Sequence, residues 1–188
     1  MGAACGPIAF ATAWAVLGAG AGGYDPTRDA ISRLAELGAP TRPAMTAGLL
    51  ALAAGMGLYG LARRPDPVWA VAVANGLTAL AVAGLPLGGR VDTAHGVAAA
   101  LGYITLAAIP VVSARRLPPA QARAAVAAGA VCALCLVASA LVERSGLFQR
   151  LGLAVAQGWV VVSAVGLLRS PTSSSTTPPD RAPAAPPR

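Results

Sequence analysis

The sequence predicts an all-α, polytopic integral membrane protein: a bundle of six transmembrane helices with a short amphipathic interfacial helix between the first and second. Three observations predict this class. Hydrophobic residues make up 56% of the 188 residues, charged residues make up 11%, and mean hydropathy is +0.65, whereas soluble domains are about one-quarter charged. Six apolar runs each approach the roughly 20 residues that cross about 30 Å of hydrocarbon. Polar segments rich in proline, glycine or arginine separate the runs.

The six runs place one membrane domain over residues 1–170. The first run ends in Gly18 and Gly22, a spacing that favours close contact between helices. Prolines and arginines close the later runs, as in the Arg63-Arg64-Pro65 turn, because proline cannot continue a helix. The predicted spans are residues 3–23, 44–62, 68–87, 95–114, 122–142 and 151–168. Residues 171–188 are rich in Pro, Ser and Thr and are predicted to be a disordered tail.

The charge of the chain indicates a membrane lipid as its partner and argues against nucleic acid. The net charge is +7, and all fourteen basic residues are arginines. They stand singly or in pairs at the ends of apolar runs, where they anchor helices at lipid headgroups, and they form no basic face with interleaved aromatics. Nothing in the sequence identifies a protein partner.

The arginine distribution also predicts an orientation in the cell (plasma) membrane. Six spans put both termini on one side. If that side is cytoplasmic, it holds eight arginines against six on the other side, which agrees with the positive-inside rule. We therefore expect a multi-pass protein with cytoplasmic termini.

Cofactors and metals are not expected. Cys132 and Cys135 lie inside an apolar run with no His or acidic residue nearby, so we interpret them as packing residues. A single His without a Cys or second His as partner does not make a zinc site. Asn75 and Gln157, which lie inside spans, are interpreted as hydrogen-bonding partners between helices.

The stretch between the first two spans, residues 23–40, holds three of the seven acidic residues. Asp25 followed by Pro26 is typical of a helix N-cap and first helical position, and Gly38 is typical of a helix end. We therefore predict a helix from about Pro26 to Leu37. Its apolar residues share one face and its charged residues another, as expected for a helix at the membrane surface.

The first, third and fifth connections must lie on the same side of a six-span bundle. That side collects five of the seven acidic residues and the only histidine. Carboxylate, hydroxyl and imidazole groups can transfer protons, and guanidinium groups can bind a phosphate headgroup. The candidate catalytic residues are Asp29, Ser32 and His95, and the candidate substrate-binding residues are Tyr24, Arg28, Asp92 and Arg150.

A purely structural interpretation of these residues remains open. The charges of residues 26–37 are then solvated or paired, at about 0–1 kcal/mol per exposed pair. His95, three residues after Asp92, then bonds that carboxylate or caps the turn; otherwise it serves as an acid, a base or a headgroup donor. Spacing alone does not separate the two interpretations.

Three segments resemble the six-span bacterial and archaeal proteins of domain-of-unknown-function family 998 (DUF998). They are YDPTRDAISRLAELGAP, DTAHGVAAALGY and GLFQRLGL, and the resemblance covers residues 3 to about 168. The family pattern of Tyr-x-Pro-x-Arg-Asp-x-Ile-Ser, a later His and Gly-Leu-x-x-Arg falls here on Tyr24, Pro26, Arg28, Asp29, Ile31, Ser32, His95, Gly146 and Arg150. Many members have an acid after the motif serine, where this chain has Arg33. A more distant similarity is to DRAM-like membrane proteins, which include GPI-lipid remodelling proteins.

Three functions remain in competition. The first is binding or modification of a lipid or isoprenoid headgroup at the polar, non-cytoplasmic face, which the grouping of the candidate residues favours. The second is a small-solute or proton-coupled permease, although the span interiors carry almost no charge. The third is a non-enzymatic accessory membrane subunit. The residues do not decide whether the protein is an enzyme.

Overall fold

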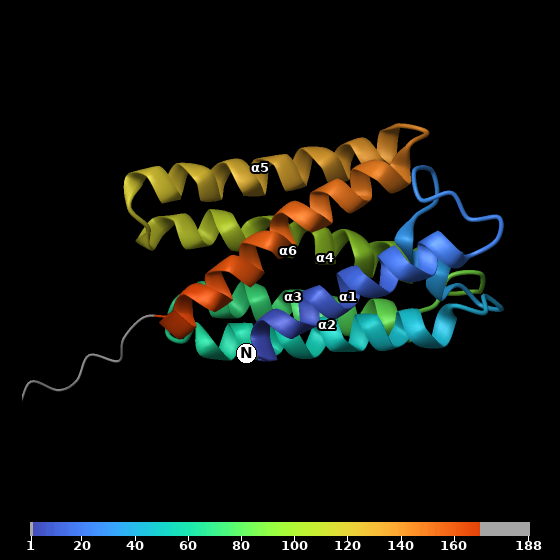
Figure 1. The fold of residues 1–188 in the computed structure, drawn as a ribbon, viewed down its shortest axis with the longest axis horizontal. Coiled ribbons are helices and arrows are strands. Elements are labelled where there is room, and N and C mark those ends of the chain that lie inside the picture. Colours follow the sequence, from blue (N-terminus) through green and yellow to red (C-terminus); the bar gives the residue numbers. More distant parts are fainter. Residues whose placement is uncertain (1, 170–188) are drawn as a thin grey trace, which may run out of the picture.

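The computed structural model describes residues 2–169, and its regular elements are all helices (Figure 1). Two 3-10 helices, η1 (Ile31–Ala35) and η2 (Ala114–Arg116), accompany the long helices. The predicted tail, residues 171–188, lies outside the described residues. The six α-helices are α1 (Gly2–Gly20), α2 (Arg42–Ala62), α3 (Val68–Gly84), α4 (Asp92–Ser113), α5 (Pro119–Leu141) and α6 (Ser145–Arg169).

The helices have the length and surface of membrane spans. Five of them are long and apolar enough to cross a membrane, and α3 is apolar but only 17 residues long. Large apolar side chains also cover the outside of the bundle, where Ile104, Leu134 and Val162 are 66%, 69% and 71% exposed. Such an apolar exterior is unfavourable in water and suits contact with lipid. The all-α class and the multi-pass membrane character are therefore confirmed.

Helices that are consecutive in the chain pack against each other, and α6 also contacts α1. Helices α1 and α2 approach each other closely at Gly6 and Gly55, where a Cβ added to Gly6 would lie 2.7 Å from the Gly55 Cα. Small residues allow this approach. The predicted contact residues behave differently: Gly18 packs on the Tyr24 ring, and nothing lies within 4 Å of a Cβ placed on Gly22.

The first, third and fifth connections lie together at one end of the bundle, as predicted (Figure 1). The Leu37 amide donates to the Leu87 carbonyl at 2.9 Å, which joins the first and third connections. The Gly146 amide donates to the Arg28 carbonyl at 3.3 Å, which joins the first connection to the start of α6. The other two connections lie at the opposite end, with the N-terminus.

The predicted amphipathic helix at residues 26–37 was wrong in extent and in position. Asp25 caps only one turn, Ala30 is extended, and η1 covers Ile31–Ala35. Ile31 and Leu34 are 4% and 1% exposed, so the apolar side of η1 packs inside the bundle. The reason is tertiary: groups of α6 take the backbone carbonyls that a longer helix would have used internally.

Candidate functional site

The first connection begins with one short, capped turn. The Thr27 amide and hydroxyl both donate to Asp25 Oδ1, at 2.8 and 2.7 Å. The Asp29 amide donates to the Asp25 carbonyl at 2.7 Å, which closes the turn. The two hydrogen bonds from Thr27 hold the pKa of the exposed Asp25 carboxyl below its ordinary value. Asp25 is therefore an N-cap, as the sequence predicted, but of a turn that does not continue into a helix.

The carbonyls of this turn cap the N-terminus of α6. The first amides of a helix have no partner within the helix. In α6, the Gly146 amide donates to the Arg28 carbonyl and the Leu147 amide donates to the Thr27 carbonyl at 2.9 Å. The Ser145 hydroxyl donates to the Arg28 carbonyl at 2.6 Å. We refer to Tyr24–Ala30 together with Ser145–Arg150 as the junction.

Arg150 is the centre of the junction. Its Nη1 donates to the carbonyls of Pro26, Asp29 and Gly146 at 2.6, 3.0 and 2.9 Å, and its Nη2 donates to the Tyr24 hydroxyl. The guanidinium also lies over the rings of Trp14 and Tyr24, at 5.6 and 5.5 Å. Arg150 is only 9% exposed. Main-chain oxygens and aromatic rings, with no carboxylate among them, surround this buried cation within the described residues.

Tyr24 completes the junction as a neutral phenol. Burial raises the pKa of Tyr24, and the neighbouring Arg150 guanidinium opposes part of that rise. The phenol therefore keeps its proton at neutral pH. Its hydroxyl donates to the Ala30 carbonyl at 3.2 Å, while it accepts from Arg150. Tyr24 thus fixes the extended backbone that leads into η1.

Three of the predicted site residues are at the surface. Asp29 accepts from the Asp25 amide at 2.8 Å and lies 3.7 Å from Arg33. The Arg28 side chain is 69% exposed and lies 3.9 Å from the Asp25 carboxylate. Asp92 is exposed and accepts from the Gly89 amide at 3.0 Å. These three side chains lie at the end of the bundle with the first, third and fifth connections, and they do not line the bundle interior.

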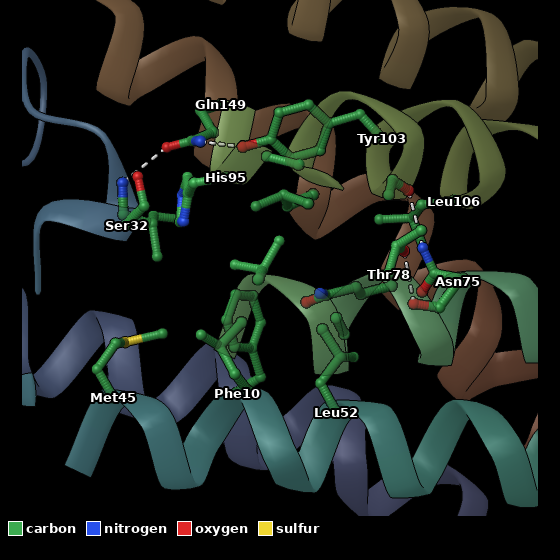
Figure 2. A pocket seen from close by; sticks show the side chains of 18 residues that line it. Phe10, Ser32, Met45, Leu52, Asn75, Thr78, His95, Tyr103, Leu106 and Gln149 are labelled. Atoms are coloured by element: carbon green, nitrogen blue, oxygen red, sulfur yellow. Dashed lines mark hydrogen bonds between the residues drawn. The ribbon is translucent and has the colours of Figure 1, made fainter. Parts of the chain in front are cut away.

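Ser32 and His95 instead line an interior cavity of about 80 Å³ (Figure 2). The cavity lies between α1, α2, α3, α4, α6 and η1, and α5 contributes no lining residue. Most of its wall is apolar, and no Arg, Lys, Asp or Glu lines it among the described residues. The polar residues of the wall are Ser32, Asn75, Thr78, His95, Tyr103, Gln149 and Gln157.

His95 has one nitrogen bound and one nitrogen without a partner. Its ring is 4% exposed, and its Nδ1 lies 2.5 Å from the Leu85 carbonyl oxygen. Because a carbonyl can only accept, Nδ1 carries the proton of this bond, and in a neutral ring Nε2 keeps a lone pair. Nε2 is buried and has no hydrogen-bond partner within residues 2–169. The sequence allowed two structural roles for His95, a bond to Asp92 or a cap of the turn; the bond to Asp92 is absent, because Nδ1 bonds the Leu85 carbonyl and Nε2 has no partner within the described residues.

Gln149 connects the junction to the cavity. Its Oε1 accepts from the Ile31 amide at 2.8 Å, and its Nε2 donates to the Tyr103 hydroxyl (Figure 2). The first bond fixes the start of η1 and therefore the position of Ser32. Ser32 Oγ makes no side-chain hydrogen bond in the described part of the chain, which leaves it available to a ligand.

Gln157 is the least satisfied side chain of the cavity. It is 3% exposed, and neither Oε1 nor Nε2 of its amide has a partner within the described residues. The prediction of a hydrogen bond between helices was therefore wrong for Gln157. It was correct for Asn75, whose Nδ2 donates to the Gly102 carbonyl at 2.8 Å and to Thr105 Oγ1 at 3.1 Å.

Sequence reasoning missed Gln149, Tyr103 and Gln157 as parts of the site. One signal was present: Gln149, Leu153 and Gln157 are spaced four residues apart, which places them on one face of α6. Two amides on the same face of an apolar helix indicate a polar interior surface. The described residues contain no group of three or more His, Cys, Asp or Glu side chains that could hold a metal ion.

Comparison with known proteins is consistent with the membrane fold and leaves the activity open. No curated protein and no solved structure matches this chain. The similarity to DRAM-like proteins therefore stays a prediction. The model of one family, described as "Protein of unknown function (DUF998)", matches residues 4–166, and it includes the residues of the junction and of the cavity wall. The chain belongs to the DUF998 family.

Proposed function

We propose that this protein binds the polar end of a membrane lipid in its interior cavity. One observation carries the proposal: His95 Nε2 and both polar atoms of the Gln157 amide are buried without partners beside one cavity. Leaving a buried hydrogen-bonding group unsatisfied costs about 1–3 kcal/mol. Native proteins rarely keep such groups without a reason, and a ligand that hydrogen-bonds to them supplies one.

The lining of the cavity matches an amphipathic ligand. Phe10, Met45 and Leu52 form part of an apolar wall, which suits hydrocarbon, and a small number of polar groups fix the orientation of what binds. Figure 2 shows Ser32, His95 and Gln149 toward one end of the cavity and Asn75 toward the other. A volume of about 80 Å³ accommodates the polar end of a lipid and not its chains. The chains therefore extend along the apolar helices.

The depth of the polar groups agrees with a site that starts at the membrane surface. Gln149 follows the start of α6 by four residues, or about 6 Å of helix, and Gln157 follows it by twelve, or about 18 Å. The cavity thus reaches from the end of the bundle with the first, third and fifth connections toward its middle. In this proposal the exposed Arg28 and Asp92 and the partly buried Asp29 contact headgroups around the entrance.

We also infer that all six helices cross the cell (plasma) membrane, with both termini in the cytoplasm. The 17 residues of α3 give about 26 Å of helix, and apolar residues at 85–87 extend it toward the surface. The connections on either side of α3 lie at opposite ends of the bundle, which supports a full crossing. The arginines favour the stated orientation.

A proton-coupled permease receives less support. Intramembrane proton coupling normally uses ionisable carboxylates or histidine chains. The cavity wall holds one histidine and no carboxylate among the described residues. An accessory subunit remains the interpretation to which a negative binding result would lead.

Lipid that co-purifies with the full-length protein tests the proposal. Wild type, Gln157→Leu and Gln121→Leu are purified in a mild detergent, washed extensively, and the retained lipid is measured by mass spectrometry. Gln121 is exposed on α5 and makes the matched control. We expect one lipid class to be enriched near one molecule per chain in wild type and in Gln121→Leu, and about tenfold less of it in Gln157→Leu. Retained lipid that only mirrors the bulk membrane, or equal retention by Gln157→Leu, would overturn the proposal.

A further inference from the structure

We infer that the bound lipid is an uncharged glyceride with a free hydroxyl, and that this hydroxyl donates its hydrogen bond to His95 Nε2. The inference rests on the proposed function and specifies its ligand. It follows from three features of the cavity: which atom lacks a partner, the absence of charge on the wall, and a second unsatisfied group deeper inside.

The first feature is the hydrogen-bonding direction at His95. The Leu85 carbonyl accepts from Nδ1, so in a neutral His95 ring Nε2 can only accept. A ligand group beside it must therefore donate a hydrogen. A hydroxyl donates, whereas ester carbonyls, ethers and phosphodiesters only accept. Ser32 lines the same cavity and can donate to the hydroxyl oxygen or accept from the ligand.

The second feature is charge. Moving an anion out of water without a counter-charge is costly. No arginine lines the cavity among the described residues. Arg150 follows Gln149 directly in α6, but its Nη1 and Nη2 donate to three carbonyls and to the Tyr24 hydroxyl. A phosphate would lack a cation here, so the cavity favours an uncharged lipid.

The third feature is the Gln157 amide, which has an acceptor and two donor hydrogens without partners. A lipid with one hydroxyl and no other polar atom would satisfy His95 and leave Gln157 unpaired. A glyceride carries ester carbonyls a few bonds below its free hydroxyl, and these can accept from the Gln157 Nε2. Among uncharged lipids with a hydroxyl, a glyceride therefore fits the cavity better than a long-chain polyprenol.

Four lipid probes test this inference on the wild-type, full-length protein in nanodiscs of phosphatidylcholine. They are dioleoylglycerol, its 3-O-methyl ether, dioleoylphosphatidic acid and a polyprenol, each titrated and its Kd measured by native mass spectrometry. The methyl ether removes only the donor hydrogen, and phosphatidic acid keeps the acyl chains but adds charge. We expect dioleoylglycerol to bind about tenfold more tightly than each of the other three probes.

The variant His95→Phe tests whether His95 Nε2 accepts the hydrogen bond from the lipid hydroxyl. In His95→Phe the acceptor is absent, so we expect dioleoylglycerol and its methyl ether to bind equally, whereas Gln121→Leu keeps the wild-type preference. If His95→Phe does not fold, the four Kd values of the wild type still decide the question. Equal or tighter binding of the methyl ether, phosphatidic acid or the polyprenol overturns the inference and leaves the proposed function standing. Binding of none of the four, together with no enriched co-purifying lipid, overturns the proposed function itself.

Discussion

The junction and the cavity are both built from polar groups inside an apolar bundle, and they differ in whether those groups have partners. In the junction, Arg150, Tyr24 and the first amides of α6 all bond to carbonyls of the first connection. In the cavity, His95 Nε2 and the Gln157 amide have none in the described chain. Gln149 belongs to both regions, and both polar atoms of its amide have a partner. In our proposal, this difference separates residues that build the fold from residues that bind a ligand.

The largest effect is expected from Gly146→Ala, which tests the junction. A Cβ at this position would lie 2.7 Å from the Pro26 carbonyl oxygen and would also collide with the Asp29 carbonyl oxygen. Both oxygens are backbone atoms, so the junction must open. We expect a loss of about 3 kcal/mol or more, because overpacking here also breaks hydrogen bonds.

Thermal unfolding in detergent, followed by tryptophan fluorescence, measures this loss. Gly158→Ala is the matched control in the same helix, since nothing lies within 4 Å of its added Cβ. The control should be neutral or slightly stabilising. Equal melting temperatures for the two variants would show that the junction is not tightly packed.

The next effect is expected from Arg150→Lys. An ammonium group cannot reproduce the planar fork that reaches several carbonyls and the Tyr24 hydroxyl. We expect a loss of about 2–3 kcal/mol, measured by the same unfolding experiment. Arg28→Lys, at an exposed pair, should change stability by less than about 1 kcal/mol.

Lipid preference provides the second readout for Arg150→Lys. If Arg150 only builds the junction, the folded variant keeps the wild-type ratio between dioleoylglycerol and phosphatidic acid. A selective loss of phosphatidic acid binding would instead return Arg150 to the phosphate-binding role that the sequence suggested.

A gain in stability is expected from Gln157→Leu, which tests the cavity. The change replaces two buried, unpartnered polar atoms with apolar ones of similar bulk. We expect the lipid-free protein to become more stable by about 1–2 kcal/mol. Gln121→Leu, at the exposed position on α5, should leave stability within about 0.5 kcal/mol.

Unfolding of delipidated protein measures this gain. Replacing a structural residue usually destabilises a protein, whereas replacing a ligand-binding residue often stabilises it. A clear loss of stability in Gln157→Leu would show that Gln157 stabilises the fold. The junction and the cavity would then not differ in the way described above.

The smallest effect is expected from acid titration of Asp25. The folded-state pKa of its carboxyl is lowered, so the stability that it contributes is present above the unfolded-state pKa and is lost as pH falls through the lower folded-state value. The melting temperature of the wild type should therefore fall slightly as the pH is lowered through this range. Asp25→Asn keeps a hydrogen-bond acceptor but has no titrating charge, so this part of the fall should be absent. The same acid dependence in both proteins would contradict the Asp25 cap.

Sequence reasoning was most successful where one-dimensional signals suffice. Apolar runs between prolines and glycines predicted the helices, and the order of the connections predicted that the first, third and fifth would share one end of the bundle. The helix at 26–37 was wrong because its capping signals are local, whereas its carbonyls bond to residues about 120 positions away.

The candidate site was only half predictable for a related reason. Ser32 and His95 were predicted as candidate catalytic residues because they share one side of the bundle, and the structure places both at the cavity. Asn75 and Gln157 look alike in sequence, as single amides inside apolar runs. Only the packing distinguishes them, because α4 offers Asn75 partners and no described residue offers one to Gln157.

The bond between the first connection and α6 also has a consequence for biosynthesis. The Pro26 carbonyl is synthesised 124 residues before Arg150, on the order of ten seconds earlier at ordinary elongation rates. Until α6 emerges, the backbone of residues 26–29 lacks its partners and must stay in contact with water or with the insertion machinery. Packing of α6 therefore completes the first connection, and chains that end before residue 145 are expected to expose this segment to proteases.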